Sequence, residues 1–234
     1  VYFDSMLRPT FTRELDIADP STARYQKTTY NHNNQVLFSS FPSASTSATL
    51  GMDMEFDTLG RMTKSTRNSD NAFTTMRYLS GNKVETTDPK GNITTTSYLA
   101  YGSPSQSKAL LIDSAGIVDT AINYNLYGQI TDITQGNVTE NRYYDSKQQL
   151  CKTSRPDTGK VAFAYTPQRQ LLWQAKGATG SSVLCDTVSV LSAEKTTYAY
   201  NNLNQISSEN FFDSTIDKDY EYNENSQLTS LVAG

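Results

Sequence analysis

Apolar and polar residues alternate along much of the chain in short stretches that end in an aromatic residue. Met52, Met54 and Phe56 occupy every second position of one stretch, with acidic residues between them. Tyr220 and Tyr222 repeat this spacing near the end of the sequence. Because successive side chains of a β-strand point to opposite faces, the pattern predicts strands with one face lined by aromatic and apolar residues.

The residues after each aromatic follow a second pattern, which is typical of a tight turn. The order is Asp or Asn, two variable positions, Gly or Asn, Arg or Gln, an apolar residue, and Thr or Ser. Residues 56–63, 124–131, 200–207 and 222–229 carry it. Asp or Asn suits the first position of a type I turn, because its side chain accepts a hydrogen bond from backbone further on. Gly or Asn three residues later adopts the left-handed conformation that closes a short hairpin with a bulge.

This aromatic-and-turn unit recurs along the whole chain with a mean period of about 24 residues. The copy that begins at Tyr165 fits the pattern least well. We interpret ten aromatic residues as structural anchors of successive repeats: Phe3, Tyr30, Phe56, Tyr78, Tyr98, Tyr124, Tyr144, Tyr165, Tyr200 and Tyr222. The glycines interpreted as turn glycines are Gly60, Gly81, Gly91, Gly102, Gly128 and Gly159.

A second turn signal lies between consecutive anchors. Its clearest examples are Asp88-Pro89-Lys90-Gly91-Asn92 and residues 155–160. Each period therefore contains strand, turn, strand and turn, and two strands of about six residues leave no room for a helix. Because a lone hairpin is marginal in water, neighbouring hairpins should join edge to edge, with the anchors stacked in a ladder. The expected fold is all-β, with consecutive antiparallel β-hairpin repeats forming one long curved or spiralling sheet.

The spacing of the anchors also predicts the domain organisation. We expect a single array of about ten repeats over residues 1–234. The interval between Tyr165 and Tyr200 is long and contains a stretch of small residues, so we expect an inserted loop or hairpin near residues 176–195. The sequence opens inside a repeat and without Met, so we interpret it as a piece of a longer protein.

Composition supports a thin sheet. Hydrophobic residues make up 36% of the chain, below the usual share of roughly 45–50%. Fifteen tyrosines supply side chains that bury a ring while the hydroxyl stays wet. The net charge of -4 argues against a nucleic-acid partner, because no basic stripe is present to neutralise phosphates. No apolar run approaches the ~20 residues of a membrane span.

Few residues suggest chemistry, so we expect no catalytic, cofactor-binding or metal-binding residue. His32, the only histidine, lies in a predicted turn, and we interpret it as a solvated side chain. Cys151 and Cys185 are too few for a disulfide framework; they could pair, but we favour two ordinary strand residues. Trp173 is expected in the core or on a sheet face. The acids at positions 213, 217, 219, 221 and 224 match no EF-hand spacing and alternate as the wet face of a strand would.

Phe56-Asp57-Thr58-Leu59-Gly60-Arg61-Met62-Thr63, together with the turn at Asp88, resembles the RHS/YD repeat. The resemblance covers nearly the whole chain in ten copies. It implies a β-strand ribbon that spirals into a hollow shell, as in bacterial polymorphic toxins, the B and C components of insecticidal toxin complexes, and teneurins. In bacterial members the shell encloses a C-terminal toxic domain until delivery. The family's C-terminal plug, with its Asp-Pro-x-Gly-Leu signature and cleaving aspartates, is not found here, so no catalytic residue is carried over.

The resemblance implies a structural, non-catalytic shell segment, secreted or at the cell surface and bacterial. Its implied partners are the remainder of the shell and an enclosed toxin domain. One alternative is an extracellular module that binds a carbohydrate or a receptor through rows of Tyr and Thr. A weaker alternative is a five-bladed β-propeller of paired hairpins, since two periods approach the ~40–50 residues of a blade.

Overall fold

A computed structural model describes residues 1–100, 106–177, 185 and 190–234. The described residues contain β-strands and two short 3₁₀ turns, η1 (Pro20–Thr22) and η2 (Ser192–Glu194), but no α-helix. The predicted all-β class is therefore confirmed. The chain divides into two compact units, residues 1–119 (unit 1) and residues 120–234 (unit 2). The boundary falls within strand β11 (Ile117–Tyr124).

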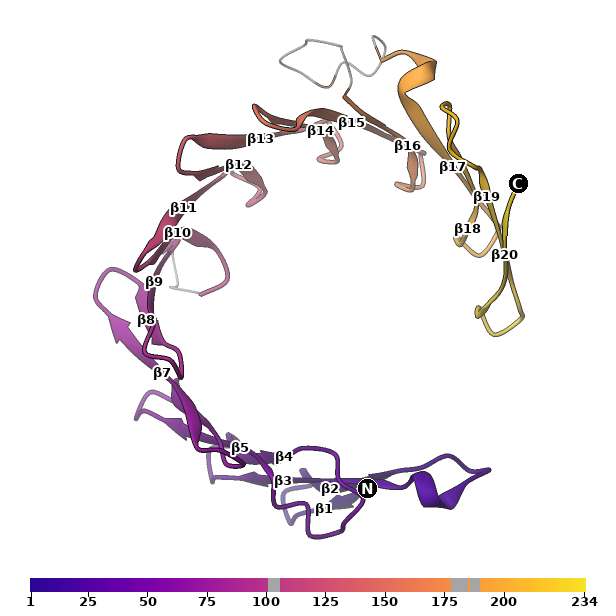
Figure 1. The fold of residues 1–234 in the computed structure, drawn as a ribbon. Coiled ribbons are helices and arrows are strands. Elements are labelled where there is room, and N and C mark those ends of the chain that lie inside the picture. The colour runs from indigo at the N-terminus through magenta and orange to yellow at the C-terminus, as the bar shows by residue number, and fades with distance from the viewer. Residues whose placement is uncertain (101–105, 178–184, 186–189) are drawn as a thin grey trace. The chain divides into compact units, whose positions relative to one another are not determined.

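Unit 1 is a run of antiparallel hairpins in which each strand pairs with the next strand along the chain. Figure 1 shows these strands as a single layer. Their bounds are β1 Tyr2–Phe3, β2 Pro9–Glu14, β3 Arg24–Tyr30, β4 Val36–Ser40, β5 Gly51–Phe56, β6 Met62–Arg67, β7 Ala72–Leu79, β8 Lys83–Thr87, β9 Ile93–Tyr98 and β10 Ala109–Ser114.

Unit 2 repeats this arrangement from β11 onward, again with each strand antiparallel to the next. The further bounds are β12 Ile130–Gln135, β13 Val138–Tyr144, β14 Leu150–Arg155, β15 Gly159–Tyr165, β16 Leu171–Lys176, β17 Lys195–Tyr200, β18 Ile206–Asn210, β19 Lys218–Tyr222 and β20 Leu228–Ala233. The predicted succession of hairpins is confirmed. In a propeller, backbone pairing stops after each four-stranded blade. Here it continues from hairpin to hairpin within each unit, so the propeller alternative is wrong.

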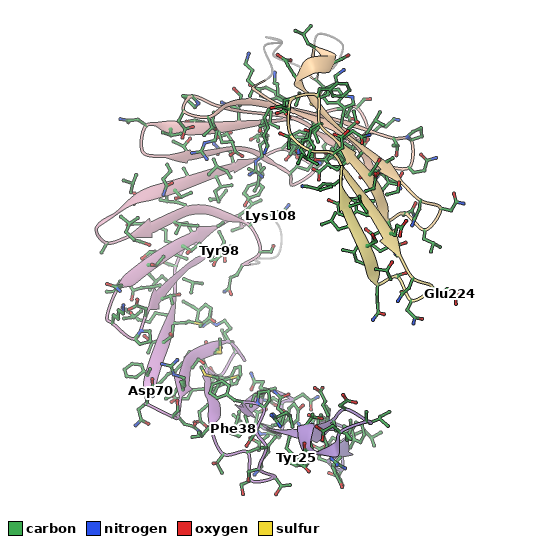
Figure 2. The ribbon with its side chains drawn as sticks, turned by 45° about the vertical axis from the view of Figure 1, so that its right-hand side comes forward. Tyr25, Phe38, Asp70, Tyr98, Lys108 and Glu224 are labelled. Carbon is green, nitrogen blue, oxygen red and sulfur yellow. A yellow bond between two sulfur atoms is a disulfide. The ribbon has the colours of Figure 1, made fainter. Side chains whose placement is uncertain are left out.

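The strands alternate between a half-buried and an exposed face. In β5, Met52, Met54 and Phe56 are half-buried, whereas Asp53 and Glu55 are exposed. Side chains project from both faces of the layer, as Figure 2 shows, with Asp70 and Glu224 at turns. The chain exposes 15377 Å², whereas a compact monomer of this mass exposes about 10,500 Å². The excess confirms that the sheet is thin and offers much of its surface to solvent.

The hydrophobic core of the described residues is small and lies in unit 2. Trp173 of β16 packs there with Ala162, Ala175 and Val190, and Ala175 is completely buried. Trp173 is 8% exposed, in agreement with its expected place in the core. Lys195 places its Nζ 4.5 Å from the centroid of the indole ring, a cation–π contact. The connection from β16 to β17, where an insertion was expected, contributes Val190 to this core.

The two cysteines do not behave as expected. We favoured two ordinary strand residues, but Cys151 and Cys185 form a disulfide with a Cα–Cα distance of 5.4 Å. Cys151 lies in β14 and is 3% exposed, while Cys185 belongs to the connection between β16 and β17. Sequence spacing gave no basis for the pairing, because the two residues are 34 positions apart and come together only in the folded chain.

Candidate functional site

The most regular feature of the molecule is a five-residue turn that we call the clasp. In each clasp the backbone N–H of the first residue donates to the carbonyl of the fifth, and the N–H of the fourth donates to the carbonyl of the first. The fourth residue has a positive φ, whether it is glycine, as at Gly60 (81°), or not, as at Leu7 (59°). The clasps of the described residues are 4–8, 31–35, 57–61, 88–92, 125–129, 145–149, 166–170, 201–205 and 223–227.

The first side chain of the clasp satisfies backbone donors inside the turn. Oδ1 of Asp57 accepts hydrogen bonds from the N–H groups of Leu59 and Arg61, at 3.0 and 2.9 Å. Asn and Asp do this in the other clasps, which explains why one of them follows the aromatic anchor. Thr166 accepts only one such bond, from the N–H of Gln170 at 3.2 Å. This agrees with the poor fit of that copy to the sequence pattern.

The first and fifth side chains also bond to each other, and their chemistry is matched. In three of the clasps that begin with Asp, the fifth side chain supplies a donor, as Arg8 Nε does to Asp4 at 2.7 Å and Arg61 Nε to Asp57 at 2.8 Å. In the fourth, Asp145 accepts a hydrogen bond from the backbone N–H of the fifth residue. Where the first residue is Asn, its Nδ2 donates to the Oε1 of a glutamine, as at Asn201 and four residues later (2.7 Å). The same amide pairs occur at 31 and 35, 125 and 129, and 223 and 227. Asn would place its own donor against Arg, so the two positions change together.

Eight of the ten anchors end a strand directly before a clasp, whereas the chain continues differently after Tyr78 and Tyr98. Tyr78 is the penultimate residue of β7, and the loop after it is three residues long, with Leu79 paired to Lys83 and no clasp. Tyr98 ends β9, and residues 101–105 after it lie outside the described residues. Conversely, the Asp88 turn, interpreted as a second kind of turn, has full clasp geometry.

Five anchor hydroxyls connect their hairpin to the preceding one. The Tyr78 hydroxyl donates to the Met62 carbonyl at 2.8 Å, and the Tyr144 hydroxyl donates to the Ile130 carbonyl at 2.8 Å. In each case the acceptor is the first residue after a clasp. The same bond joins Tyr30 to Pro9, Tyr165 to Leu150 and Tyr200 to Leu171. This anchor ladder is therefore held by phenol-to-backbone hydrogen bonds as well as by ring burial.

The fifth side chain of a clasp reaches along the edge of the sheet. The Arg61 guanidinium lies 4.1 Å from the centroid of the Tyr78 ring, and Arg8 covers Tyr30 at 4.7 Å. Glutamines instead contact the next clasp. Gln35 Nε2 donates to the Gly60 carbonyl at 2.9 Å, and the side chain at 129 donates to the carbonyl at 148. Several successive clasps are thus bonded to one another within each unit.

The Thr or Ser that ends the repeat pattern has a role that sequence reasoning missed. The pairing register shifts beside the anchors that precede a clasp, which leaves this residue in a bulge. Thr229 Oγ1 donates to the Glu221 carbonyl oxygen at 3.1 Å, and Thr10 Oγ1 donates to the Tyr2 carbonyl oxygen at 3.4 Å. In these two repeats the bulge hydroxyl therefore satisfies the carbonyl just before the anchor. The recurring Thr or Ser in the eighth position was the available signal.

Hydrogen bonds within the clasps and burial of the anchor rings shift the pKa values of clasp aspartates and of anchor tyrosines. Hydrogen bonds from the side chain and backbone of Arg8 lower the pKa of Asp4 below its ordinary value of 3.8, and Arg61 acts likewise on the pKa of Asp57. The Asn92 side chain is the main cause of the lowered pKa of Asp88. Burial raises the pKa of Tyr144 above its ordinary value of 10.0. At neutral pH Asp4, Asp57 and Asp88 are therefore ionised, and the Tyr144 phenol keeps its proton and donates.

Five of the turn glycines occupy left-handed backbone, at Gly60, Gly81, Gly91, Gly128 and Gly159. Their φ values lie between 76° and 86°, a region that costs other residues more. The sixth, Gly102, lies outside the described residues.

The residues considered for chemistry are dispersed. His32 is exposed in the clasp 31–35. Asp213 and Asp217 each accept a backbone N–H, from Thr215 and Phe211, as turn residues do. Among the residues that the structure describes, no group of three His, Cys, Asp or Glu side chains could hold a metal ion. The same residues include no helix with the length and apolarity of a membrane span.

Comparison with known proteins agrees with this repeat geometry. The family model described as Teneurin YD-shell matches residues 4–176. A comparison with curated proteins gives no match.

Parts of two solved structures share this fold. The chain is similar to part of the crystal structure of TcdB2-TccC3-TEV, with a TM-score of 0.58 and 15% identity, over 94% of this chain and 14% of that one. It is also similar to part of the Photorhabdus luminescens Tc holotoxin pore, with a TM-score of 0.57 and 16% identity, over 94% and 13% of the two chains. The chain therefore spans about one seventh of the length of the structures it matches.

Proposed function

Because the chain belongs to the teneurin YD-shell family, we propose that it is a non-catalytic wall segment of a β-shell that encloses or presents a C-terminal toxin cargo. Its partners are the remainder of that shell and the enclosed toxin domain. The similarity to segments of toxin complexes supports the choice of cargo.

The anchor ladder carries the proposal. Polar groups that recur with the repeat, such as Asp57, Arg61 and Tyr78, are engaged with neighbouring turns and strands. They therefore hold hairpin to hairpin, and none of them converges with others around a space where a substrate would react. A shell segment needs such regular bonds between neighbouring hairpins. An enzyme instead needs polar groups that depart from the repeat and gather around a substrate.

The disulfide supports a location outside the reducing cytosol. Structural disulfides persist in oxidising compartments such as the cell exterior. The Cys151–Cys185 bond therefore favours a secreted or cell-surface protein.

Protease protection of the natural full-length protein tests the proposal. The toxin domain should resist a soluble protease until the wall is weakened. Replacing Asp4, Asp57 and Asp88 together by Ala removes the side chains that satisfy three clasps, and should speed digestion of the cargo. His32→Ala, at an exposed position within a clasp, is the matched control. Rapid digestion of the cargo in the unmodified protein would overturn the enclosing role.

A further inference from the structure

One face of the first three strands carries a group of aromatic and cationic side chains. Tyr2 of β1 lies opposite Phe11 of β2, and Phe11 lies opposite Lys27 of β3. Two residues further along β2, Arg13 lies opposite Tyr25. Residues directly opposite each other in an antiparallel pair share a face, as do residues two apart in one strand. We call this group the aromatic platform: Tyr2, Phe11, Arg13, Tyr25 and Lys27.

The three rings of the aromatic platform touch one another and remain open to solvent. Phe11 stacks on Tyr25, which Figure 2 labels, with ring centroids 5.6 Å apart. Phe11 also meets Tyr2 edge to face at 5.8 Å. Tyr2 is 67% exposed, and the other two rings are half-buried. The platform therefore presents a continuous aromatic surface that crosses three strands.

The two cations of the platform form no ion pair with any residue that the structure describes. Both are exposed, and the Arg13 guanidinium lies 6.0 Å from the centroid of the Tyr25 ring. Glu14, the next residue of β2, points to the opposite face. Asp16 and Asp19 in the loop that follows accept hydrogen bonds from the backbone of that loop. The positive charge of the platform is thus left for an external partner.

At two places further along the same face, a cation lies opposite an acid. Strand register carries this face from β3 through β4 to the strands β5 to β8. There Lys64 pairs with Glu55 at 3.1 Å, and Arg77 pairs with Glu85 at 2.8 Å. In the platform the positions opposite the cations are occupied by rings instead. The platform is therefore a local departure from the way the repeat arranges its charges.

We propose that the aromatic platform binds an anionic polysaccharide. The C–H face of a sugar ring is apolar and packs on exposed aromatic rings, while the anionic groups of the polysaccharide pair with Arg13 and Lys27. An extended chain of sugars matches an open surface across three strands, whereas a compact ligand is usually held in a concave pocket. A nucleic acid calls for a row of cations along its phosphates, and the platform has two. This assignment does not depend on whether the shell encloses a cargo.

Binding to the natural full-length protein tests the proposal. Two anionic probes differ in their charged group: an oligogalacturonate carries carboxylates, and a sulfated dextran oligosaccharide carries sulfates. Calorimetry should detect binding of at least one probe, and the binding should weaken as the salt concentration rises. Methyl-esterified oligogalacturonate and unsulfated dextran keep the sugar rings without the charge, and should bind much more weakly. Failure of both anionic probes to bind, or equal binding of the uncharged forms, would overturn the proposal.

Variants assign the binding to the platform. Arg13→Gln with Lys27→Gln removes both charges and should raise the Kd of the bound probe about tenfold. Tyr2→Ala removes the most exposed ring and should raise the Kd about fivefold. Arg24→Gln is the matched control, because it removes an exposed cation of β3 on the opposite face. It should leave the Kd unchanged. If either platform variant binds as tightly as the unmodified protein, the site does not have the assigned composition.

Oligothymidylate separates a polysaccharide from a nucleic acid. Its bases also stack on aromatic side chains, and its phosphates also pair with cations. The proposal expects its Kd to be markedly higher than that of the bound polysaccharide probe. Equal or tighter binding that is lost in the same variants would assign the platform to nucleic acid and contradict the proposal.

Discussion

The two units build the same clasp with different chemistry. In unit 1, three clasps begin with an acid, at Asp4, Asp57 and Asp88, and the fifth side chain donates to it. In unit 2, three begin with Asn, each paired with the carbonyl oxygen of a glutamine side chain: Asn125, Asn201 and Asn223. The exceptions are Asn31 in unit 1, and Asp145 and Thr166 in unit 2. One backbone shape is thus closed by charged pairs on one side of the boundary and mostly by neutral pairs on the other.

The units also differ in packing. Unit 2 contains the cluster around Trp173 and the disulfide, whereas the buried apolar residues described in unit 1, Ala23, Ala48 and Val84, form no cluster with one another. Unit 1 instead has three rings in contact: Phe11 stacks on Tyr25, with centroids 5.6 Å apart, and meets Tyr2 edge to face at 5.8 Å. The comparison shows that the repeat specifies the ladder but leaves both clasp charge and core packing free to vary.

The largest test of the packing difference is Trp173→Ala. Removing a buried indole that is 8% exposed should cost ~3–5 kcal/mol of local stability, through lost transfer energy and a cavity. Hydrogen exchange of peptides from β15, β16 and β17 measures the loss, which should be confined to unit 2 because repeat arrays couple chiefly to nearest neighbours. Phe73→Ala in unit 1, at a ring that is 49% exposed, is the control and should cost about 1 kcal/mol or less. Equal losses would remove the contrast.

The second test is low pH, which should destabilise the clasps of unit 1 before those of unit 2 that begin with Asn. The pKa values of Asp4, Asp57 and Asp88 are lowered in the folded chain, so their contribution to stability is present above the ordinary value of 3.8 and is lost as pH falls below it. Three clasps of unit 1 are titrated together, while clasps that begin with Asn carry no such proton. Hydrogen exchange, corrected for intrinsic rates, should therefore rise first at residues 4–8, 57–61 and 88–92. Simultaneous loosening at residues 201–205 would contradict the assignment.

Loss of a single anchor hydroxyl should have a similar effect in both units. Tyr78→Phe and Tyr144→Phe each remove one hydrogen bond of 2.8 Å to a backbone carbonyl, at a cost of about 0.5–1.5 kcal/mol. Phe56 is a natural anchor without a hydroxyl, and Phe56→Tyr should gain stability by reaching the Val36 carbonyl. Thermal unfolding measures all three, with the exposed Tyr127→Phe as a neutral control. A cost in one unit only would show that the ladder is not shared.

Much of this organisation is encoded locally and could be predicted. The alternation of apolar residues identified the strands, and the position of Asp57 and Gly60 within the repeat identified a turn with a left-handed residue and a bulge. Those features depend on residues within about eight positions of one another. The clasp at Asp88 was placed correctly between anchors, but its identity with the other clasps was missed because no aromatic precedes it.

Contacts that depend on sheet register could not be predicted in the same way. Tyr144 reaches Ile130 across 14 positions, and Tyr200 reaches Leu171 across 29, because an insertion intervenes. The disulfide crosses 34 positions and joins β14 to a residue inside that irregular interval. One overlooked signal was local: Arg at the fifth clasp position occurs with Asp at the first, and Asn at the first occurs with Gln at the fifth, so these side-chain pairs can be read from the sequence. The clasp of Asp145 and Gln149 follows neither rule.

Exchanging the clasp chemistry is the finest test of the comparison. Asp57→Asn alone sets the Asn amide against the Arg61 guanidinium, two donors without an acceptor between them, and should lower the melting temperature. Adding Arg61→Gln creates the amide pair seen at Asn201, and should recover part of the loss and remove the acid sensitivity of that clasp. Recovery stays partial because Arg61 also covers the Tyr78 ring. If the double variant melts no higher than the single one, the matched pairing of the first and fifth side chains does not hold the clasp, and the contrast between the units has no energetic meaning.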